Sequence, residues 1–488
     1  MADDRRPAGG RGAPLVALTA LALVPALAIG GVWQYADANV PPPTTTTTTT
    51  LPPGEPAPEL ATDLFSYRRH PEPLAAAAAV AATEARLAEL TTDLTSRLGD
   101  GACLQMLAED GAVIAEVAPT APLLPASTHK LLVAAVALDV LGSTYRFRTE
   151  LFAAAPPVDG VIAGDVFLVG GGDPLLVSAD TPDPHLRPAF NTTPVEPLAD
   201  ALVALGTVRI DGAVVADGSR YDDQFRPPSW GADIDDLNGN PTDALVIDDA
   251  QIDPGNYGDD PNFAAARVFA DLLAARGITV VQQTDSRPRP ADVPLVSLGF
   301  VESRPLSDVL VEMLHTSDNS TAEMLLKELG FTVAGVGSRQ AGLEVVWARL
   351  GMWGVPRDGV VMADGSGLSR ENRLTCATLT GLLTVAPVAR ELIRLMPVAG
   401  RDGTLADQLL GTPAEGELRA KTGSLTGVRG LAGEMRDAAG DDVAFTLLLN
   451  GDGVADPAVY GPVWEQLVDL IAELPVAVAP DETRFAPR

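Results

Sequence analysis

The apolar run over residues 131–141 restricts the fold of this chain more than any other segment. It is long enough for a helix buried in a core. Lys130 leads directly into this run, which is an unusual place for a solvated charge. With 488 residues the chain is long enough to enclose such a core, in about two to four domains. The run therefore predicts a large folded body with a lysine at the entrance of a buried helix.

Ser127 stands three residues before Lys130, and residues three apart share one face of a helix. A serine hydroxyl attacks as a nucleophile only when a base takes its proton. Lys130 can be that base if burial or a neighbouring cation lowers its pKa. Backbone N–H groups at a helix N-terminus also stabilise an oxyanion. Taken alone, the motif equally fits a helix-capping serine followed by a solvated lysine.

Two further motifs follow along the chain. Ser317-Asp318-Asn319 comes after a helix predicted to end near Leu314, and its residue types also favour a helix cap or turn. Lys421-Thr422-Gly423 opens a predicted strand, and its glycine lets a substrate backbone approach closely. Taken alone, this motif also fits an edge-strand lysine followed by a glycine bulge. Together and in this order, the three motifs are the signature that the penicillin-recognising serine enzymes share.

Apolar periodicity and turn residues predict the elements around these motifs. The residue pattern changes over residues 145–295, where short apolar strands alternate with clusters of Gly, Asp and Pro. We therefore expect a separate α+β insertion in this region. The predicted helices are 74–98, 131–141, 197–205, 262–276, 306–330, 338–350 and 457–474; the predicted strands include 161–168 and 208–215, with hairpins at 103–117 and 418–450.

Longer motifs indicate a narrower family. The sequence resembles the D-alanyl-D-alanine carboxypeptidase/endopeptidases of the penicillin-binding protein 4 type, the low-molecular-mass class C group. The likeness runs over residues 74–474. The segments that carry it are Pro125-Ala126-Ser127-Thr128-His129-Lys130-Leu131-Leu132, Tyr145-Arg146-Phe147-Arg148-Thr149, Gly171-Gly172-Asp173-Pro174, Asp364-Gly365-Ser366-Gly367-Leu368-Ser369-Arg370, Gly400-Arg401-Asp402-Gly403-Thr404-Leu405 and Arg419-Ala420-Lys421-Thr422-Gly423-Ser424-Leu425.

The resemblance implies an α/β (α+β) penicillin-binding/β-lactamase-like transpeptidase fold, in which helices flank an antiparallel sheet. Residues 67–148 and 300–476 would form the DD-peptidase domain, residues 149–299 the inserted α+β domain, and residues 477–488 a tail. The insertion is shorter than in the larger family members, which leaves substrate positioning and endopeptidase activity open. Ser424 stands where the family often has threonine, so a hydroxyl is retained.

The resemblance also implies the roles of the site residues. Ser127 would attack the peptide carbonyl between two D-alanines, with Lys130 as the base, and form an acyl-enzyme that water releases. Ser317 would relay a proton towards the leaving amine. The backbone N–H groups of Ser127 and Ser424 would form the oxyanion hole. The catalytic residues are thus Ser127, Lys130 and Ser317, and the substrate-binding residues are Asn319, Lys421, Thr422 and Ser424.

The substrate side of the site follows from the same resemblance. Asn319 would bind the backbone amide of the substrate. Lys421 would supply positive charge near Ser317 and near the terminal carboxylate of the substrate, and Thr422 would donate a hydrogen bond to that carboxylate. Peptidoglycan stem peptides would be the substrates and β-lactams covalent inhibitors. No cofactor and no metal is implied, and with only four histidines in the chain a His-rich metal site is not expected.

The N-terminus predicts the compartment. Arg5, Arg6 and Arg11 (tail 1–12) precede an apolar segment (13–35) whose core of roughly 21 residues suits a membrane helix. A Pro/Thr-rich linker (36–66) follows and would hold the catalytic body away from the membrane. We therefore expect a single-pass cell-membrane protein with an extracytoplasmic catalytic domain. The alternative is secretion after signal cleavage near Ala36-Asp37-Ala38.

Composition narrows the remaining alternatives. A net charge of −31 argues against a nucleic-acid partner. The two cysteines, Cys103 and Cys376, are too few for a disulfide scaffold, and the sequence leaves open whether they pair. A serine β-lactamase would use the same acylation motifs, and a wall-binding scaffold could retain them without activity. The preference for carboxypeptidase or endopeptidase substrates also stays open.

Overall fold

The computed structural model of the chain describes residues 85–86, 88–179, 188–231, 234, 237–253 and 256–474. The predicted cytoplasmic tail, membrane segment, Pro/Thr-rich linker and C-terminal tail lie outside the described residues. Within those ranges, no helix combines the length and the apolar character that a membrane crossing requires. The described part of the first predicted helix is helical as far as Ser96.

A five-stranded sheet joins the two ends of the described chain. Its order is β15-β16-β17-β1-β2, and every neighbouring pair is antiparallel. The predicted hairpin at 103–117 is confirmed as β1 and β2. The hairpin predicted at 418–450 is a three-stranded meander, because Asp437 accepts backbone N–H bonds in a second tight turn. The strands are β1 Ala102–Leu107, β2 Val113–Val117, β15 Arg419–Leu425, β16 Val428–Arg436 and β17 Asp442–Asn450.

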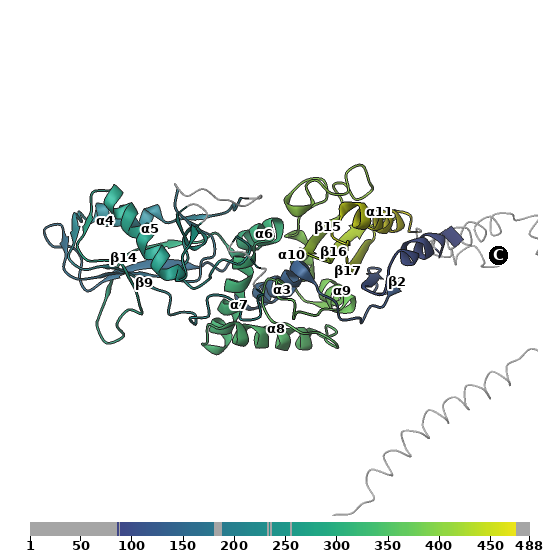
Figure 1. The fold of residues 1–488 in the computed structure, drawn as a ribbon, viewed down its shortest axis with the longest axis horizontal. Coiled ribbons are helices and arrows are strands. Elements are labelled where there is room, and N and C mark those ends of the chain that lie inside the picture. The colour runs from purple at the N-terminus through teal and green to yellow at the C-terminus, as the bar shows by residue number, and fades with distance from the viewer. Residues whose placement is uncertain are drawn as a thin grey trace, which may run out of the picture. The chain divides into compact units, whose positions relative to one another are not determined.

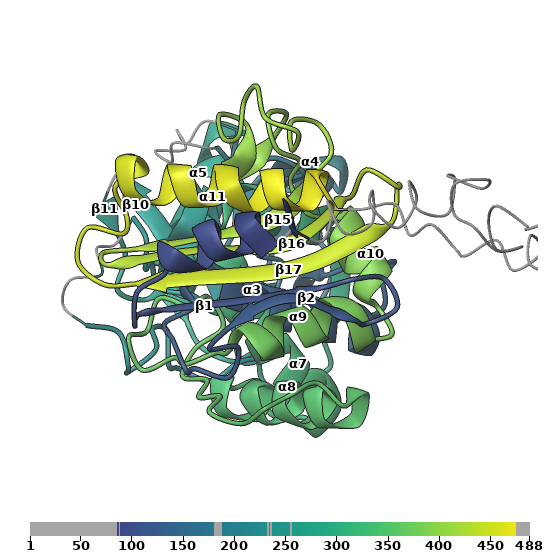
Figure 2. The ribbon, with the colours of Figure 1, turned by 90° about the vertical axis from the view of Figure 1, so that its right-hand side faces the viewer.

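Helices cover both faces of this sheet, and each face has its own apolar core. On one face α11 (Pro457–Ala472) buries Trp464 and Leu467 against strand residues such as Phe445. On the other face α9 (Cys376–Val385) packs with α3 (Lys130–Leu141). Figure 2 shows α11 and α9 on opposite sides of the sheet. The antiparallel sheet flanked by helices therefore agrees with the expected architecture.

Helix α3 is buried as the apolar run predicted, since all residues from Lys130 to Leu138 are buried. The helical periodicity at 306–330 belongs to two helices, and the end predicted near Leu314 falls at Ser317, which takes a left-handed conformation with φ of 67°. Helices α9 and α10 were not predicted. The helices around α3 are α6 Leu306–Thr316, α7 Asn319–Ala334, α8 Arg339–Trp353, α9 Cys376–Val385 and α10 Ala389–Arg394.

The region between β2 and α6 contains a second sheet with a separate apolar core. Its order is β13-β9-β5-β3-β14, and α4 and α5 pack on it (Figure 1). The strands predicted at 161–168 and 208–215 are each broken in two. The first breaks at Gly164-Asp165, where Gly164 has φ of 100° and the Asp165 side chain accepts the N–H of Ala213. The domain boundaries stay a prediction.

The broken strands contribute to two different sheets. The first halves, β4 and β8, form a three-stranded sheet with β12. The second halves, β5 and β9, belong to the sheet β13-β9-β5-β3-β14. The larger elements are β3 Arg148–Ala153, β5 Val166–Val169, β9 Val214–Asp217, β14 Val296–Glu302, α4 Glu196–Ala204 and α5 Pro261–Ala275. The short strands are β4 Val161–Ile162, β6 Leu176–Val177, β7 Thr193–Pro194, β8 Arg209–Ile210, β10 Gln251–Asp253, β11 Asn256–Tyr257, β12 Thr279–Val280 and β13 Asp285–Ser286.

The two cysteines form a disulfide, which answers the question that the sequence left open. Cys103 lies in β1 and Cys376 is the first residue of α9, and their sulfur atoms are 2.02 Å apart. Both residues are fully buried in the core between the sheet and α3. The bond therefore ties α9 to the middle of the sheet.

Candidate active site

Ser127 lies in a single turn of 3₁₀ helix, η1 (Ala126–His129), that leads directly into α3. Two glycines make room for this turn. A side chain at Gly367 would place its Cβ 2.0 Å from the carbonyl oxygen of Ala126, and one at Gly423 would place it 2.6 Å from that of Pro125. The space at Gly423, which the sequence analysis left for a substrate backbone, is thus occupied by the nucleophile segment of the protein itself.

Lys130 lies fully buried behind Ser127, and its ammonium group has three hydrogen-bond partners. The Nζ atom is 3.0 Å from Ser127 Oγ, 2.7 Å from Asn319 Oδ1 and 2.8 Å from the carbonyl oxygen of Ser366. The last two oxygens can only accept hydrogen bonds. A neutral Lys130 has two hydrogens for these two acceptors, so its lone pair is directed at the Ser127 hydroxyl. The geometry therefore aligns the lysine as a base for Ser127.

The surroundings of Lys130 lower its pKa to about 8. Burial is the main cause, because it disfavours the charged ammonium. The carboxylates of Asp318, Asp364 and Glu323 oppose this change by stabilising the ammonium. A lysine with a pKa near 8 is a far better base at neutral pH than an ordinary solvated lysine. The condition that the sequence analysis placed on Lys130 is thus met by burial.

The Ser-Asp-Asn motif lies at the break between α6 and α7. Asp318 caps α7, and its carboxylate accepts the backbone N–H of Thr321. Asn319 begins α7, and its Nδ2 donates to the carbonyl oxygen of Asn238 over 2.8 Å. This bond turns Asn319 Oδ1 towards Lys130. Asn238, in the region between β2 and α6, therefore supports the orientation of Asn319, a contact that no sequence motif indicated.

Ser317 and Lys421 form the second pair of the site. The left-handed conformation of Ser317 brings its side chain to Lys421 on β15, where Nζ donates to Ser317 Oγ over 2.9 Å. Lys421 is fully buried and also donates to the carbonyl oxygen of Thr422 over 3.0 Å. A proton that leaves Ser317 can be replaced from this ammonium group.

A cleft of about 550 Å³ collects the predicted site residues. Ser127, Ser317, Asn319, Thr422 and Ser424 line it, and Lys130 and Lys421 lie directly behind two of these serines. All seven predicted residues are therefore brought together from three distant parts of the chain. Their individual roles stay predictions.

Three groups at the site were not named as site residues. Thr404 lines the cleft and accepts a hydrogen bond from Thr422 Oγ1 over 2.8 Å. The carbonyl oxygen of Ser366 binds Lys130, and that of Asn238 binds Asn319. Thr404 and Ser366 lie in segments that carried the family resemblance, so a signal for them existed. No sequence motif marked Asn238, because it acts through its backbone carbonyl, a group that every residue has.

His129 lies beside the nucleophile but does not contact it in the described structure. The residue is fully buried, and its Nδ1 lies 3.3 Å from the carbonyl oxygen of Gly365. Burial lowers the pKa of the His129 imidazole, and because a carbonyl oxygen only accepts hydrogen bonds, Nδ1 donates this one. Within the described ranges, no three His, Cys, Asp or Glu residues are grouped so as to hold a metal ion.

Comparison with known proteins agrees with this arrangement. The sequence profile of the D-Ala-D-Ala carboxypeptidase 3 (S13) family matches residues 83–258 and 257–474. The chain is 31% identical to the D-alanyl-D-alanine carboxypeptidase of an Actinomadura species over 467 residues, which cover 80% of this chain and 86% of the relative.

Solved structures show the same fold. The crystal structure of penicillin binding protein 4 from Haemophilus influenzae superposes with a TM-score of 0.68 at 24% identity, and covers 78% of this chain and 99% of that one. A second structure of the Haemophilus protein, complexed with a novel β-lactam, has a TM-score of 0.61 at 24% identity and covers 78% and 98% of the two chains.

Proposed function

This chain belongs to the D-Ala-D-Ala carboxypeptidase 3 (S13) family, and we propose that it hydrolyses D-Ala-D-Ala peptides of peptidoglycan through an acyl-enzyme on Ser127. One observation carries the proposal. The Ser127 hydroxyl is the one partner of Lys130 Nζ that can donate a hydrogen bond, and the two other partners are oxygens that only accept. This arrangement suits the activation of a serine nucleophile by a neutral lysine.

Acylation begins when Lys130 Nζ takes the proton of Ser127 Oγ. The oxygen attacks the carbonyl carbon of the penultimate D-alanine, and the negative charge moves to the carbonyl oxygen. The backbone N–H groups of Ser127 and Ser424 stabilise this oxyanion, and such a donor is typically worth about 3–4 kcal/mol in the transition state. Collapse of the tetrahedral intermediate breaks the C–N bond and leaves an ester on Ser127.

The leaving D-alanine needs a proton on its nitrogen. Ser317 Oγ donates this proton and receives another from Lys421, with which it is already hydrogen-bonded. The proton on Lys130 then returns to Lys421, so that both lysines regain their starting states. Water attacks the ester carbonyl and gives a proton to Lys130, and this proton passes to Ser127 Oγ as the shortened peptide leaves. Lys421 also attracts the terminal carboxylate of the substrate. The hydroxyls of Thr422 and Thr404 line the same cleft, and since one hydrogen bond joins them, the pair has one proton left to donate to that carboxylate.

We expect benzylpenicillin to form one covalent adduct with the protein, mapped by mass spectrometry of tryptic peptides to the peptide that contains Ser127. The Haemophilus protein, which shares the fold, binds a β-lactam, and a lactam carbonyl presents the same electrophile as the peptide. The wild type should also release D-alanine from a D-Ala-D-Ala peptide. A protein that forms no adduct and releases no D-alanine would be the wall-binding scaffold, and an adduct hydrolysed within seconds would favour the β-lactamase.

The second-order rate constant of acylation should rise with pH through a pKa near 8. Lys130 accepts a proton only in its neutral form, and its pKa is lowered to about 8. Below this pKa the neutral fraction, and hence the rate, falls roughly tenfold per pH unit. Penicillin labelling followed over time between about pH 5.5 and 9.5, a range that brackets the pKa of about 8, measures this profile. A rate that does not change across this range would contradict the role of Lys130 as a base.

We further propose that the catalytic part is extracytoplasmic and is anchored by the apolar segment 13–35. The cationic flank before that segment supports this orientation. The disulfide supports it independently, because such bonds persist in oxidising compartments outside the cytoplasm. The domain division given above is proposed with it, and the separate apolar core between β3 and β14 supports the inserted domain.

A further inference from the structure

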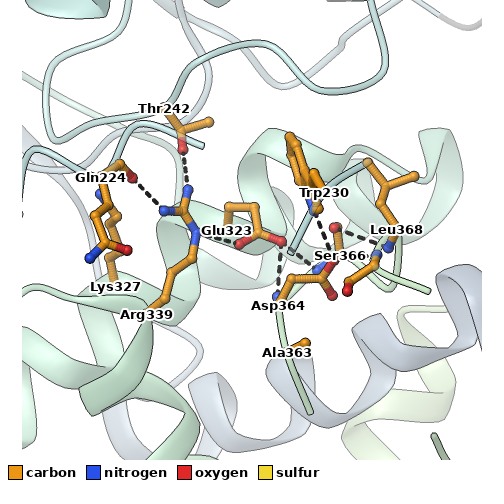
Figure 3. A network of polar contacts seen from close by, with 12 residues as sticks. Gln224, Trp230, Thr242, Glu323, Lys327, Arg339, Ala363, Asp364, Ser366 and Leu368 are labelled. Atoms are coloured by element: carbon orange, nitrogen blue, oxygen red, sulfur yellow. Dashed lines mark hydrogen bonds and ion pairs between the residues drawn. The ribbon is translucent and has the colours of Figure 1, made fainter. Parts of the chain in front are cut away.

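Glu323 is a fully buried carboxylate on α7, one helical turn after Asn319. Its Oε1 accepts the backbone N–H groups of Gly365 and Ser366 over 2.9 and 2.8 Å. Its Oε2 accepts from Arg339 Nε over 2.8 Å. These partners are all donors, so the contacts require an ionised carboxylate. Figure 3 shows Glu323 between Arg339 and the turn that contains Ser366.

The turn held by Glu323 supplies an acceptor for the catalytic lysine. The carbonyl oxygen of Ser366 accepts from Lys130 Nζ over 2.8 Å. The peptide unit of this carbonyl is also held from its other side, because the N–H of Gly367 donates to Asp364 Oδ1 over 2.8 Å. Two buried carboxylates therefore fix the direction in which the Ser366 carbonyl points. If that carbonyl turned away, Lys130 would lose one of the two acceptors that direct its lone pair at Ser127.

Arg339 connects this support to the insertion. Its guanidinium is almost fully buried and neutralises Glu323. The same group donates to the carbonyl oxygens of Gln224 and Phe225 and, over 3.2 Å, to Thr242 Oγ1. Burying Glu323 without this partner would favour its protonation. Burial raises the pKa of Glu323 and Arg339 opposes this rise, so the loop that holds the arginine in place favours the charged carboxylate near Lys130.

We propose that Glu323 is a positioning residue for Lys130, which aims the Ser366 carbonyl at the ammonium group and adds a negative charge beside it. The proposal rests on the role of Lys130 as the base for Ser127. The described groups that act electrostatically on Lys130 are the carboxylates of Asp318, Asp364 and Glu323, and the neighbouring His129 is neutral. Loss of Glu323 therefore has two separable effects, on alignment and on charge.

Glu323→Gln tests both effects. The amide has nearly the same shape, but its NH₂ must face either Arg339 or the two N–H groups of the turn, so the network that holds the turn loses a contact. We expect the plateau of the acylation rate at high pH to fall by about tenfold or more, since small misplacements at a reacting centre are costly. The rising limb of the pH profile should move to lower pH, because removal of a negative charge destabilises the ammonium of Lys130. A purely structural residue would lower the yield and the Tm without moving this limb.

Glu328→Gln is the matched control. Glu328 is also a fully buried carboxylate on α7, and it binds Arg220 and Tyr221 of the insertion. It also forms hydrogen bonds with Tyr145 and Thr332, but in the described structure with neither Lys130 nor the turn at Ser366. This variant should lose stability yet keep the wild-type acylation rate and pH profile. If both variants changed the profile alike, or if Glu323→Gln acylated like the wild type, the proposal would be wrong.

Glu323→Asp covers the case in which the glutamine variant does not fold. It keeps the charge and the pairing with Arg339, but it is one carbon too short to reach both N–H groups as well. We expect the acylation rate at high pH to be lower than in the wild type, while the rising part of the pH profile stays at the same pH. An acylation rate at high pH equal to that of the wild type would overturn the proposal. Adduct formation by the wild type in the same assay separates this outcome from a failure of the proposed function, in which no protein would be acylated.

Discussion

Lys130→Met is expected to reduce the rate constant of penicillin acylation by about a thousandfold, within the range by which a positioned base accelerates a reaction. Methionine is close to lysine in length and suits a fully buried position, so the helix should retain its packing. The variant removes the one group among the described residues that is hydrogen-bonded to Ser127 Oγ and can take its proton. Time courses of labelling with a fluorescent penicillin measure the loss, and Ser127→Ala sets the zero level.

Lys130→Arg separates a base from a mere positive charge. Arginine restores the charge beside Asn319 and Ser366, but its guanidinium does not lose a proton at accessible pH. This variant should therefore stay as slow as Lys130→Met and show no rise near pH 8. A recovery of acylation in the arginine variant would mean that Lys130 acts by electrostatic stabilisation, and the proposed mechanism would have to change.

Removal of the disulfide is expected to cost about 2–5 kcal/mol of unfolding free energy, the usual range for a native bridge. The cysteines are 273 residues apart, so the bond closes a very long loop in the unfolded chain. Neither cysteine lines the active cleft. The double variant Cys103→Ala, Cys376→Ala should therefore unfold at a lower denaturant concentration, measured by circular dichroism. Its acylation rate at about 25 °C should stay near that of the wild type.

The two single variants provide the control for this prediction. Each alanine alone already breaks the bond, so the cost of the double variant should be close to that of either single variant. A double-mutant cycle would then report strong non-additivity. If the two single costs simply added, the cysteines would stabilise the protein as separate packed side chains, and the bond between β1 and α9 would not exist in solution.

Much of the site could be predicted from the sequence because its chemistry is carried by side chains in short motifs. Ser127 and Lys130 are neighbours on one helical turn, so local geometry alone brings them together. Ser317 and Asn319 lie in a motif of helix-capping residues, and the break between α6 and α7 falls there. The strands were less predictable, because Gly164-Asp165 divides one continuous apolar stretch between two sheets.

Backbone groups and long-range pairing were not predictable in this way. The carbonyl oxygens of Ser366 and Asn238 bind the site residues, but every residue has a carbonyl and only the folded chain selects which one is used. Glu323 looks like any other glutamate in a helix until its carboxylate is found buried between Arg339 and a turn. The pairing of the two cysteines depended on how β1 meets α9.

Residue types and their spacing were enough to identify the reactive groups of the chain: a hydroxyl and an amine on one turn, a second hydroxyl with an amide, and a second amine on a strand. Such groups can be recognised locally, because they depend on residues close together in the chain. The dehydration that lowers the pKa of Lys130 to about 8, and the direction of its lone pair towards Ser127, came from the folded chain. Burial and direction depend on groups far away in the chain, and the fold alone brings those groups to the lysine.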